Sequence, residues 1–119
     1  MIHGIGIDIV HIPKFKKAVE RWGDRFKNRI FTQHELMYCE KRKFYEQHLA
    51  ARFAAKEAFL KAIGCVIQFA DIEILNNPNG CPYIVLSKNP KYRIQNLKTH
   101  LTISHDGDYC IAQVILEKN

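Results

Sequence analysis

The chain has 119 residues, of which 47% are hydrophobic, so it has the usual size of one domain and enough apolar material for one core. Its four cysteines are widely spaced and form no Cys-x-x-Cys pair, which indicates free thiols rather than a disulfide framework or a zinc site. No apolar run is long enough to cross a bilayer and no secretory signal pattern is present. We expect a single domain over residues 1–119 that works in the cytoplasm.

The positive charge of the chain is concentrated in one part of the sequence. The net charge is +6, and 13 of the 18 Lys and Arg residues lie between Lys14 and Lys61. Such a concentration indicates an acidic partner, which could be a polyphosphate, a nucleic acid or an acidic protein. Plain solubility is the competing explanation.

The first predicted element is a strand over residues 2–10. One of its faces carries three isoleucines, and the other carries Gly4, Gly6, Asp8 and Val10. Glycine inside a strand commonly allows another group to approach the backbone closely. This strand is therefore expected to lie against another element on its glycine face.

Two helices are predicted next. In the first, Pro13 fits the opening turn and Gly23 indicates an interruption. Its apolar positions recur at helical spacing, at Phe15, Val19, Trp22 and Phe26. Thr32 and Glu35 have the spacing of a capping box, so the second helix is expected from about residue 33 into the basic segment 40–43.

A third helix is predicted over residues 49–64. Its small face consists of Ala51, Ala54, Ala55, Ala58 and Ala62, and its bulky face of Leu49, Phe53, Leu60 and Ile63. Glu57 and Lys61 lie in the strip between these faces, while Arg52 and Lys56 lie on the far border of the bulky face. The simplest interpretation of Glu57 and Lys61 is an ordinary helical ion pair, worth about 0.2 to 0.5 kcal/mol.

The remainder of the chain is predicted to be mostly extended. Strands over residues 72–75 and 83–86 flank a turn at 76–80, and strands over 101–104 and 109–116 flank a turn at 105–108. A short helix is predicted over residues 90–97. One strand, then helices, then antiparallel hairpins make the expected fold class α+β.

Asp8 and Glu57 are the candidates for a metal site. Both are acidic residues inside otherwise apolar elements and next to small residues. Two carboxylates suit a hard cation, so Mg²⁺ is expected and Mn²⁺ would fit the same ligands. The alternatives are that Asp8 bonds to neighbouring backbone and that Glu57 only pairs with Lys61.

Several cations could bind phosphate. Lys61, Arg52 and the basic run at 41–43 are candidates, although the run could equally be a solvated helix end. His105 lies at a turn, where it could transfer a proton, contact a phosphate or simply be exposed. The sequence contains no P-loop, dinucleotide-binding or nucleophile-elbow motif, which argues against those three chemistries.

Three segments resemble one enzyme family: GIGIDIV at 4–10, RFAAKEAFLKAIG at 52–64 and ISHDGDYCIAQVIL at 103–116. They are similar to the holo-acyl-carrier-protein synthase family of 4'-phosphopantetheinyl transferases, and NPNGCPYI at 77–84 resembles its short bacterial type. The resemblance implies transfer of the phosphopantetheine arm of coenzyme A to a serine of apo acyl carrier protein in fatty acid biosynthesis. Adenosine 3',5'-bisphosphate would be released.

The same resemblance implies roles for the site residues. Asp8 and Glu57 match magnesium ligands, and with Lys61, which would contact the pyrophosphate, they form the expected catalytic group. Gly64 would let backbone approach the ligand. The serine proton would go to Glu57 or to a water on the metal.

The family's coenzyme A site implies further contacts. Arg52, Pro82 and His105 are expected to border the nucleotide, with the 3'-phosphate as the main target of His105 and a base role as its minor alternative. The chain departs from the common family pattern in having Lys14 for arginine, Ala51 for glycine and Asp106 for a hydroxyl residue. A carboxylate beside phosphates is unfavourable, so a nucleotide contact by Asp106 is doubtful.

The resemblance also implies partners. Lys14, Arg21 and Arg25 on the first helix are expected to contact the acidic carrier protein. Family members form homotrimers with active sites between subunits, so the same assembly is expected here. No nucleic acid and no membrane are expected as partners.

Two other functions remain open from the residues alone. A magnesium-dependent phosphoesterase would use the same carboxylates and cations with water as the nucleophile. A non-catalytic nucleic-acid-binding module would use the positive charge together with Trp22, Phe26 and Tyr45.

Overall fold

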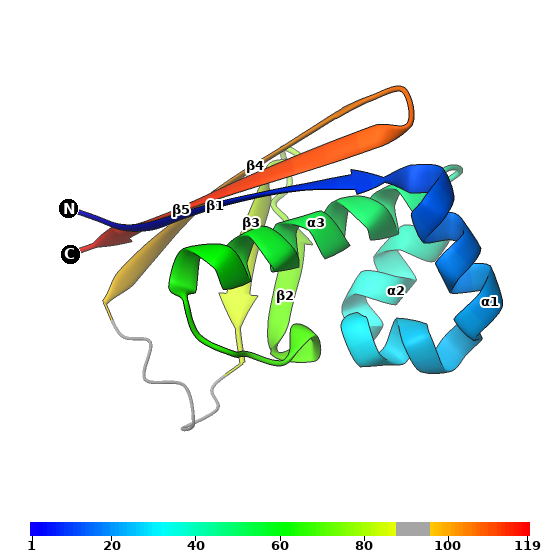
Figure 1. The fold of residues 1–119 in the computed structure, drawn as a ribbon, viewed down its shortest axis with the longest axis horizontal. Helices are drawn as coiled ribbons and strands as arrows, with labels where there is room; N and C mark the ends of the chain where they lie inside the picture. The colour runs from blue at the N-terminus through cyan, green and yellow to red at the C-terminus, as the bar shows by residue number, and fades with distance from the viewer. Residues whose placement is uncertain (88–95) are drawn as a thin grey trace.

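The computed structural model describes residues 1–87 and 96–119, and it confirms the α+β class (Figure 1). The elements follow one another as β1 (Ile2–His11), α1 (Ile12–Ile30), α2 (Gln33–Glu40), α3 (Tyr45–Ile63), η1 (Phe69–Asp71), β2 (Ile72–Asn76), β3 (Pro82–Leu86), β4 (Leu97–Asp106) and β5 (Tyr109–Lys118). A strand, then helices, then antiparallel strands is the predicted order.

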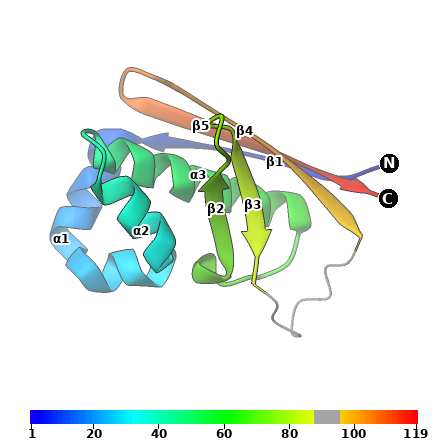
Figure 2. The same ribbon diagram turned by 180° about the vertical axis from the view of Figure 1, so that it is seen from behind.

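Helix α3 is the centre of the molecule. The antiparallel strands β1, β5 and β4 form a sheet in that order, and β2 and β3 form a separate hairpin. Figure 1 shows the sheet on one side of α3, and Figure 2 shows the hairpin and α2 on the other side. The chain ends lie together at one end of the sheet, where Met1 accepts a hydrogen bond from the backbone of Lys118. Any group on α3 is therefore held from two sides.

The contact between β1 and α3 depends on two glycines. A Cβ atom at Gly4 would collide with the carbonyl of Ala62, and one at Gly6 would collide with the carbonyl of Ala58. Ala58 is fully buried. The prediction that the glycine face of this strand receives another element is confirmed, and the element is the small face of α3.

Helix α1 is kinked where the sequence predicts it. Gly23 has φ 65° and ψ −150°, which no helix accommodates, and Pro13 lies in the first turn. The expectation that Trp22 shares the buried stripe is wrong, because the apolar core does not extend over the turn just before the kink. Trp22 is 59% exposed and stacks under the guanidinium of Arg21.

Helix α2 begins as predicted and ends earlier. The hydroxyl of Thr32 accepts a hydrogen bond from the backbone of Glu35, and the carboxylate of Glu35 accepts one from the backbone of Thr32, which confirms the capping box. The helix ends at Glu40, so the basic run forms a turn. Arg42 folds back over the ring of Tyr38, 3.3 Å from its centroid, and donates to the Tyr38 carbonyl.

Helix α3 begins at Tyr45, four residues before the predicted start, and ends where Gly64 adopts a left-handed conformation with φ 73°. The prediction placed Lys56 on a border of the helix surface, whereas its side chain is fully buried. Its ammonium donates to the carbonyls of Ile30 at 2.6 Å and Phe69 at 3.1 Å, and to Oε1 of Glu35 at 2.6 Å. Burial lowers the pKa of Lys56, and the carboxylate of Glu35 opposes that shift.

The sequence predicted only a helix-capping role for Glu35, but this residue is also the buried partner of Lys56. Besides Lys56 and Thr32, its carboxylate accepts a hydrogen bond from the backbone of Ile74 in β2 at 2.9 Å. The pair of Glu35 and Lys56, called here the buried pair, therefore joins α1, α2, α3, η1 and β2. All three ammonium protons have acceptors, which a buried charge requires.

The strands agree with their predicted positions and are longer at several ends. Strand β4 begins at Leu97, so the predicted helix over residues 90–97 is wrong at that residue, and residues 90–95 lie outside the described part of the chain. The four cysteines are free thiols, as predicted. Burial raises the pKa of Cys39 and of Cys110 to about 11, so both remain protonated at neutral pH.

Replacing Gly6 with alanine tests the close contact of α3 with β1. Because the added Cβ would meet the backbone of Ala58, strand and helix must separate, and we expect the free energy of unfolding to fall by about 3 kcal/mol. Urea denaturation at a fixed protein concentration measures the change. Thr102→Ala, at an exposed position of β4, is the control and should change stability by no more than about 0.5 kcal/mol. Equal stability of Gly6→Ala and the parent would contradict the contact.

Candidate active site

Three of the predicted catalytic residues meet where β1 crosses α3. Asp8 follows Gly6 by two residues, so the alternation of the strand turns both toward the helix. The ammonium of Lys61 lies 3.3 Å from Oδ1 of Asp8 and donates to the carbonyl of Ile7 at 2.9 Å. The close packing on Gly6 thus brings a strand carboxylate within reach of a helix cation.

Glu57 belongs to the same group. It lies one helical turn before Lys61, and its pKa is raised, first by burial and then by the negative charge of Asp8, while Lys61 opposes the shift. The negative charges of Asp8 and Glu57 repel each other, so binding of a cation beside both carboxylates is favoured. The simple interpretation of Glu57 as only a helical partner of Lys61 is incomplete, because Lys61 contacts Asp8 in this structure.

The donor set can be compared with the needs of a metal ion. Among residues 1–87 and 96–119, no group of three or more His, Cys, Asp and Glu side chains could hold a metal. Asp8 and Glu57 supply two carboxylates, which is what a magnesium site that also uses waters and substrate phosphates requires. The residues therefore fit a hard divalent cation and do not form a complete protein cage.

A cavity of about 250 Å³ lies beside the first turns of α3, and it is called here the Arg52 cavity. Three residues predicted to border coenzyme A line it: Arg52, Pro82 and His105. Sequence reasoning missed other polar residues of its wall, which are Gln47, His48 and Asn76. His48 and Gln47 precede the predicted start of the helix, and only their spacing of four and five residues from Arg52 could have indicated them.

Arg52 is held as a fixed cation in this cavity. It is 4% exposed, and its guanidinium donates to Oδ1 of Asn76 at 2.5 Å and to the carbonyl of His48 at 3.3 Å. It also lies 4.4 Å from the ring centroid of Tyr38. Its Nε is buried and has no hydrogen-bond partner among the described residues, so the guanidinium is held through its two terminal nitrogens.

The histidines of the cavity differ in exposure. Burial lowers the pKa of His48, and the positive charges of Arg52 and Arg42 and the neighbouring His105 lower it further. His48 is therefore neutral at physiological pH, while His105 is exposed at the end of β4. The permanent positive charge of Arg52, rather than the neutral His48, is therefore what would attract an anion into the cavity.

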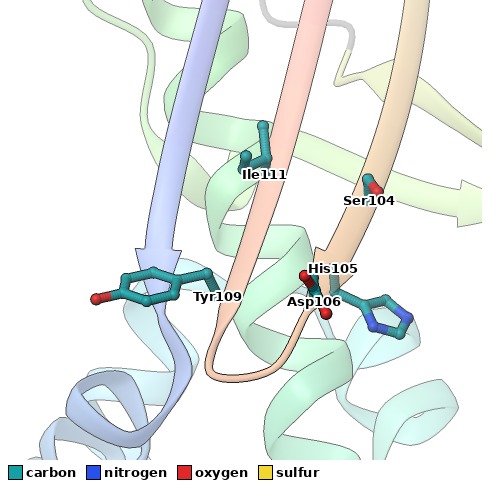
Figure 3. A pocket seen from close by; sticks show the side chains of 5 residues that line it. All are labelled: Ser104, His105, Asp106, Tyr109 and Ile111. Atoms are coloured by element: carbon teal, nitrogen blue, oxygen red, sulfur yellow. The ribbon is translucent and has the colours of Figure 1, made fainter.

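Asp106 lies on the opposite face of the sheet from His105, because consecutive residues of a strand point to opposite faces. Figure 3 shows the residues around a small cavity of about 80 Å³, which are Ser104, His105, Asp106, Tyr109 and Ile111. That Asp106 makes no contact with the nucleotide stays a prediction.

The cavity and the carboxylate group lie on different sides of α3. Glu57 is five residues beyond Arg52, so it is roughly 8 Å further along the helix axis and its direction from the axis differs by about 140°. Lys61 is roughly 14 Å beyond Arg52 and points to the opposite side of the helix. In the sheet register, Asp8 is level with Ile103, so His105 lies one row away on the same face, about 12 Å from Asp8 between Cα atoms. The two groups of one chain are therefore separate.

The predicted carrier-binding residues lie apart from these groups, on α1. Lys14, Arg21 and Arg25 are all exposed. Arg25 also lines a groove of about 520 Å³ with Trp22, Phe26 and Arg29. This surface is basic with an exposed aromatic ring, which is suitable for an acidic protein.

Gly64 lies directly after α3 and is exposed. Its left-handed conformation explains why glycine is present, since other residues rarely adopt it. No ligand contact is needed to account for it.

Comparison with known proteins gives one consistent result. The profile of the 4'-phosphopantetheinyl transferase superfamily matches residues 4–114. A holo-[acyl-carrier-protein] synthase of Koribacter versatilis is 41% identical and covers 98% of this chain and 99% of its own length. One from a Wolbachia of Drosophila simulans is 44% identical, with 98% of each chain covered.

Comparison with solved structures points to the same family. A holo-(acyl-carrier-protein) synthase of Bacillus anthracis, in complex with CoA (3',5'-ADP), has a TM-score of 0.85 and 36% identity over 100% of this chain and 99% of that one. The synthase of Helicobacter pylori in complex with coenzyme A has a TM-score of 0.83 and 36% identity, and covers 95% of this chain and 99% of that one. With a profile that spans nearly the whole sequence and relatives alike from end to end, the chain belongs to the 4'-phosphopantetheinyl transferase superfamily.

Proposed function

We propose that this protein is a holo-[acyl-carrier-protein] synthase that transfers 4'-phosphopantetheine from coenzyme A to a serine of apo acyl carrier protein. Relatives that match it over nearly their full length carry this name, and solved structures of relatives are complexes with coenzyme A. The observation that carries the proposal is the meeting of Asp8, Glu57 and Lys61, together with a separate cavity that holds the buried Arg52 on the same helix. The reported relatives support neither a phosphoesterase nor a nucleic-acid-binding module.

Asp8 and Glu57 would hold the magnesium ion. Their paired carboxylates support this role, because the charge of Asp8 raises the pKa of Glu57 and a divalent cation would relieve that repulsion. When bound, the ion supplies charge neutralisation at the pyrophosphate. Lys61 would leave its exposed pair with Asp8 to contact the same phosphates, which the weakness of exposed ion pairs permits.

The coenzyme would place its nucleotide in the Arg52 cavity. The fixed charge of Arg52 supports a phosphate contact there, and His105 and Pro82 would border the nucleotide. The neutral ring of His48 could donate one hydrogen bond to the same part. Because Arg52 and Lys61 point to opposite sides of α3, the nucleotide and the pyrophosphate of one coenzyme would contact two different subunits of the proposed trimer.

The reaction forms one bond and breaks one. The serine oxygen of the carrier attacks the phosphorus attached to pantetheine, and the phosphoanhydride bond to adenosine 3',5'-bisphosphate breaks. Glu57, or a water on the metal, is the proposed acceptor of the serine proton, as the family resemblance implies. Lys61 and Arg52 would balance the negative charge on the leaving group.

We also propose a homotrimer with active sites between subunits, as the family resemblance implies. The face of the sheet that α3 leaves uncovered supports it, because Ile5, Ile7 and Ile9 are each more than half exposed there and Ile111 lies beside them. A row of exposed isoleucines on one sheet face is typical of an interface. A second copy of the chain is the proposed occupant.

The chain would act as one domain in the cytoplasm. One apolar core joins residues from every helix and from both sheets, which supports a single domain over residues 1–119. Four free cysteines suit a compartment in which thiols remain reduced. Within the described residues, no helix is long and apolar enough to cross a membrane.

Glu57→Gln tests the catalytic group. Loss of the charge should reduce transfer at least about 100-fold while the fold is retained. The measurement is mass spectrometry of apo acyl carrier protein after incubation with coenzyme A and Mg²⁺, which detects added phosphopantetheine. Glu46→Gln, in the first turn of the same helix, is the matched control and should remain active. Near-normal transfer by Glu57→Gln, or release of the bisphosphate without carrier, would refute the proposal.

Arg21→Glu tests the carrier-binding face. Reversing this exposed charge should raise the KM for the carrier about tenfold and leave the KM for coenzyme A unchanged, because surface charges mainly steer association. Initial rates at varied carrier and salt concentrations give both constants. Lys16→Glu makes the same charge change on another side of α1 and should have a much smaller effect. Equal effects of the two variants would contradict a specific face.

Ile7→Glu tests the oligomer. A carboxylate in the row of exposed isoleucines should prevent association, because it would be buried without a partner. Light scattering after size exclusion should give the mass of three chains for the parent and of one chain for the variant. A parent that elutes as a monomer would refute the trimer.

A further inference from the structure

The packing of α3 on β1 allows close approach but does little to fix the rotation of the helix. Interlocking ridges of side chains normally set how packed elements are rotated against each other. Here Gly4 and Gly6 present no side chains, and they face the backbone of Ala58 and Ala62. The buried side chains of β5, which also contact α3, and contacts on the opposite side of the helix therefore have to hold α3 in one rotation about its axis.

The buried pair provides such a contact on the opposite side of α3. The ammonium of Lys56 is held at 2.6 Å by the carbonyl that ends α1, at 2.6 Å by Oε1 of Glu35 in α2, and at 3.1 Å by the carbonyl of Phe69 in η1. Hydrogen bonds are directional, and three acceptors on three elements leave the ammonium one position. Glu35 is itself fixed by the backbone of Thr32 and Ile74.

Lys56 and Glu57 are consecutive, so their directions from the helix axis differ by a fixed 100°. Since a side-chain tip lies roughly 5 to 6 Å from the axis, a rotation of about 10° would move the Glu57 carboxylate by roughly 1 Å. Magnesium demands near-ideal geometry at short distances, so a displacement of this size is harmful. The hydrogen bonds that hold the Lys56 ammonium therefore also hold the Glu57 carboxylate at one angle around the helix axis.

We propose that Lys56 is a positioning residue, whose three hydrogen bonds hold α3 in the rotation that turns Glu57 toward Asp8. The inference rests on the metal site of the proposed function. Apolar residues could fill the same space without the desolvation that a buried charged pair costs, but they would supply no directional bonds. The buried pair accordingly sets the orientation of α3 in addition to stabilising its contacts with the neighbouring elements.

The test uses a variant that removes both charges together, Glu35→Gln with Lys56→Met. The glutamine keeps an acceptor for Thr32 or Ile74, and no unpaired charge is left in the core. Mn²⁺ binding is followed by EPR with coenzyme A present and carrier absent. We expect the double variant to bind Mn²⁺ about tenfold more weakly than the parent, which is the usual effect of losing the support of a metal ligand.

Two comparisons make the result specific. Val19→Ala removes buried volume from α1 without touching the buried pair, so it should lower the urea midpoint and leave Mn²⁺ affinity within about twofold of the parent. Glu57→Gln, measured in parallel, should weaken Mn²⁺ binding more than the double variant does. If Glu57→Gln has no effect, the metal site itself is refuted.

Unchanged Mn²⁺ affinity in the double variant, together with weakened binding by Glu57→Gln, would overturn the positioning role and leave the metal site standing. Equal losses in the double variant and in Val19→Ala would also overturn it, because general destabilisation would then explain the loss. Should the double variant not fold, Glu35→Gln with Lys56→Gln is measured, which also leaves no buried charge but has a side chain too short to bond all three acceptors. It should weaken Mn²⁺ binding in the same direction by about threefold, and an unchanged affinity would overturn the role.

Discussion

The close packing of α3 on β1 is the constraint on which the candidate site depends. Backbone meets backbone at Gly6 and Ala58, with no room for a side chain between them. This contact brings Asp8 of the strand to the turn of the helix that carries Lys61. Neither element alone holds the group of charges, because Asp8 and Lys61 lie 53 positions apart in the chain.

The opposite side of α3 is held by polar contacts. The buried pair connects the end of α1, the start of α2 and the hairpin strand β2 to the middle of α3. It therefore lies between the helix that carries the proposed carrier-binding surface and the residues that would meet coenzyme A. A change in how α1 packs would reach Glu57 through one fully buried ammonium.

Much of the fold could be predicted from the sequence, because its local signals are strong. The capping box at Thr32, the glycine kink in α1 and the two glycines of β1 each have a single physical meaning, and the structure agrees with all of them. Trp22 was misassigned because helical spacing does not show where the cover of the core over a helix ends. The basic run after Glu40 was misassigned because no residue there marks the end of the helix.

The site was harder to predict, because burial of charge depends on tertiary contacts. Helical spacing places Lys56 and Glu57 on neighbouring borders of one helix, and nothing local says that the lysine is buried while the glutamate faces Asp8. Glu35 satisfies a cap in its own helix, so its second role with Lys56 and Ile74 leaves no trace in the sequence. The polar wall formed by His48 and Asn76 likewise comes from two elements.

The arrangement along α3 suggests why one helix carries most of the site. Arg52, Glu57 and Lys61 follow each other at a fixed rise, so their spacing cannot change without breaking the helix. This spacing sets how far apart the three charges lie along the helix axis. The partners of these residues come from other elements: Asn76 holds Arg52, and Asp8 contacts Lys61. The helix thus sets the distances, while the strands and the buried pair set the directions in which its charges point.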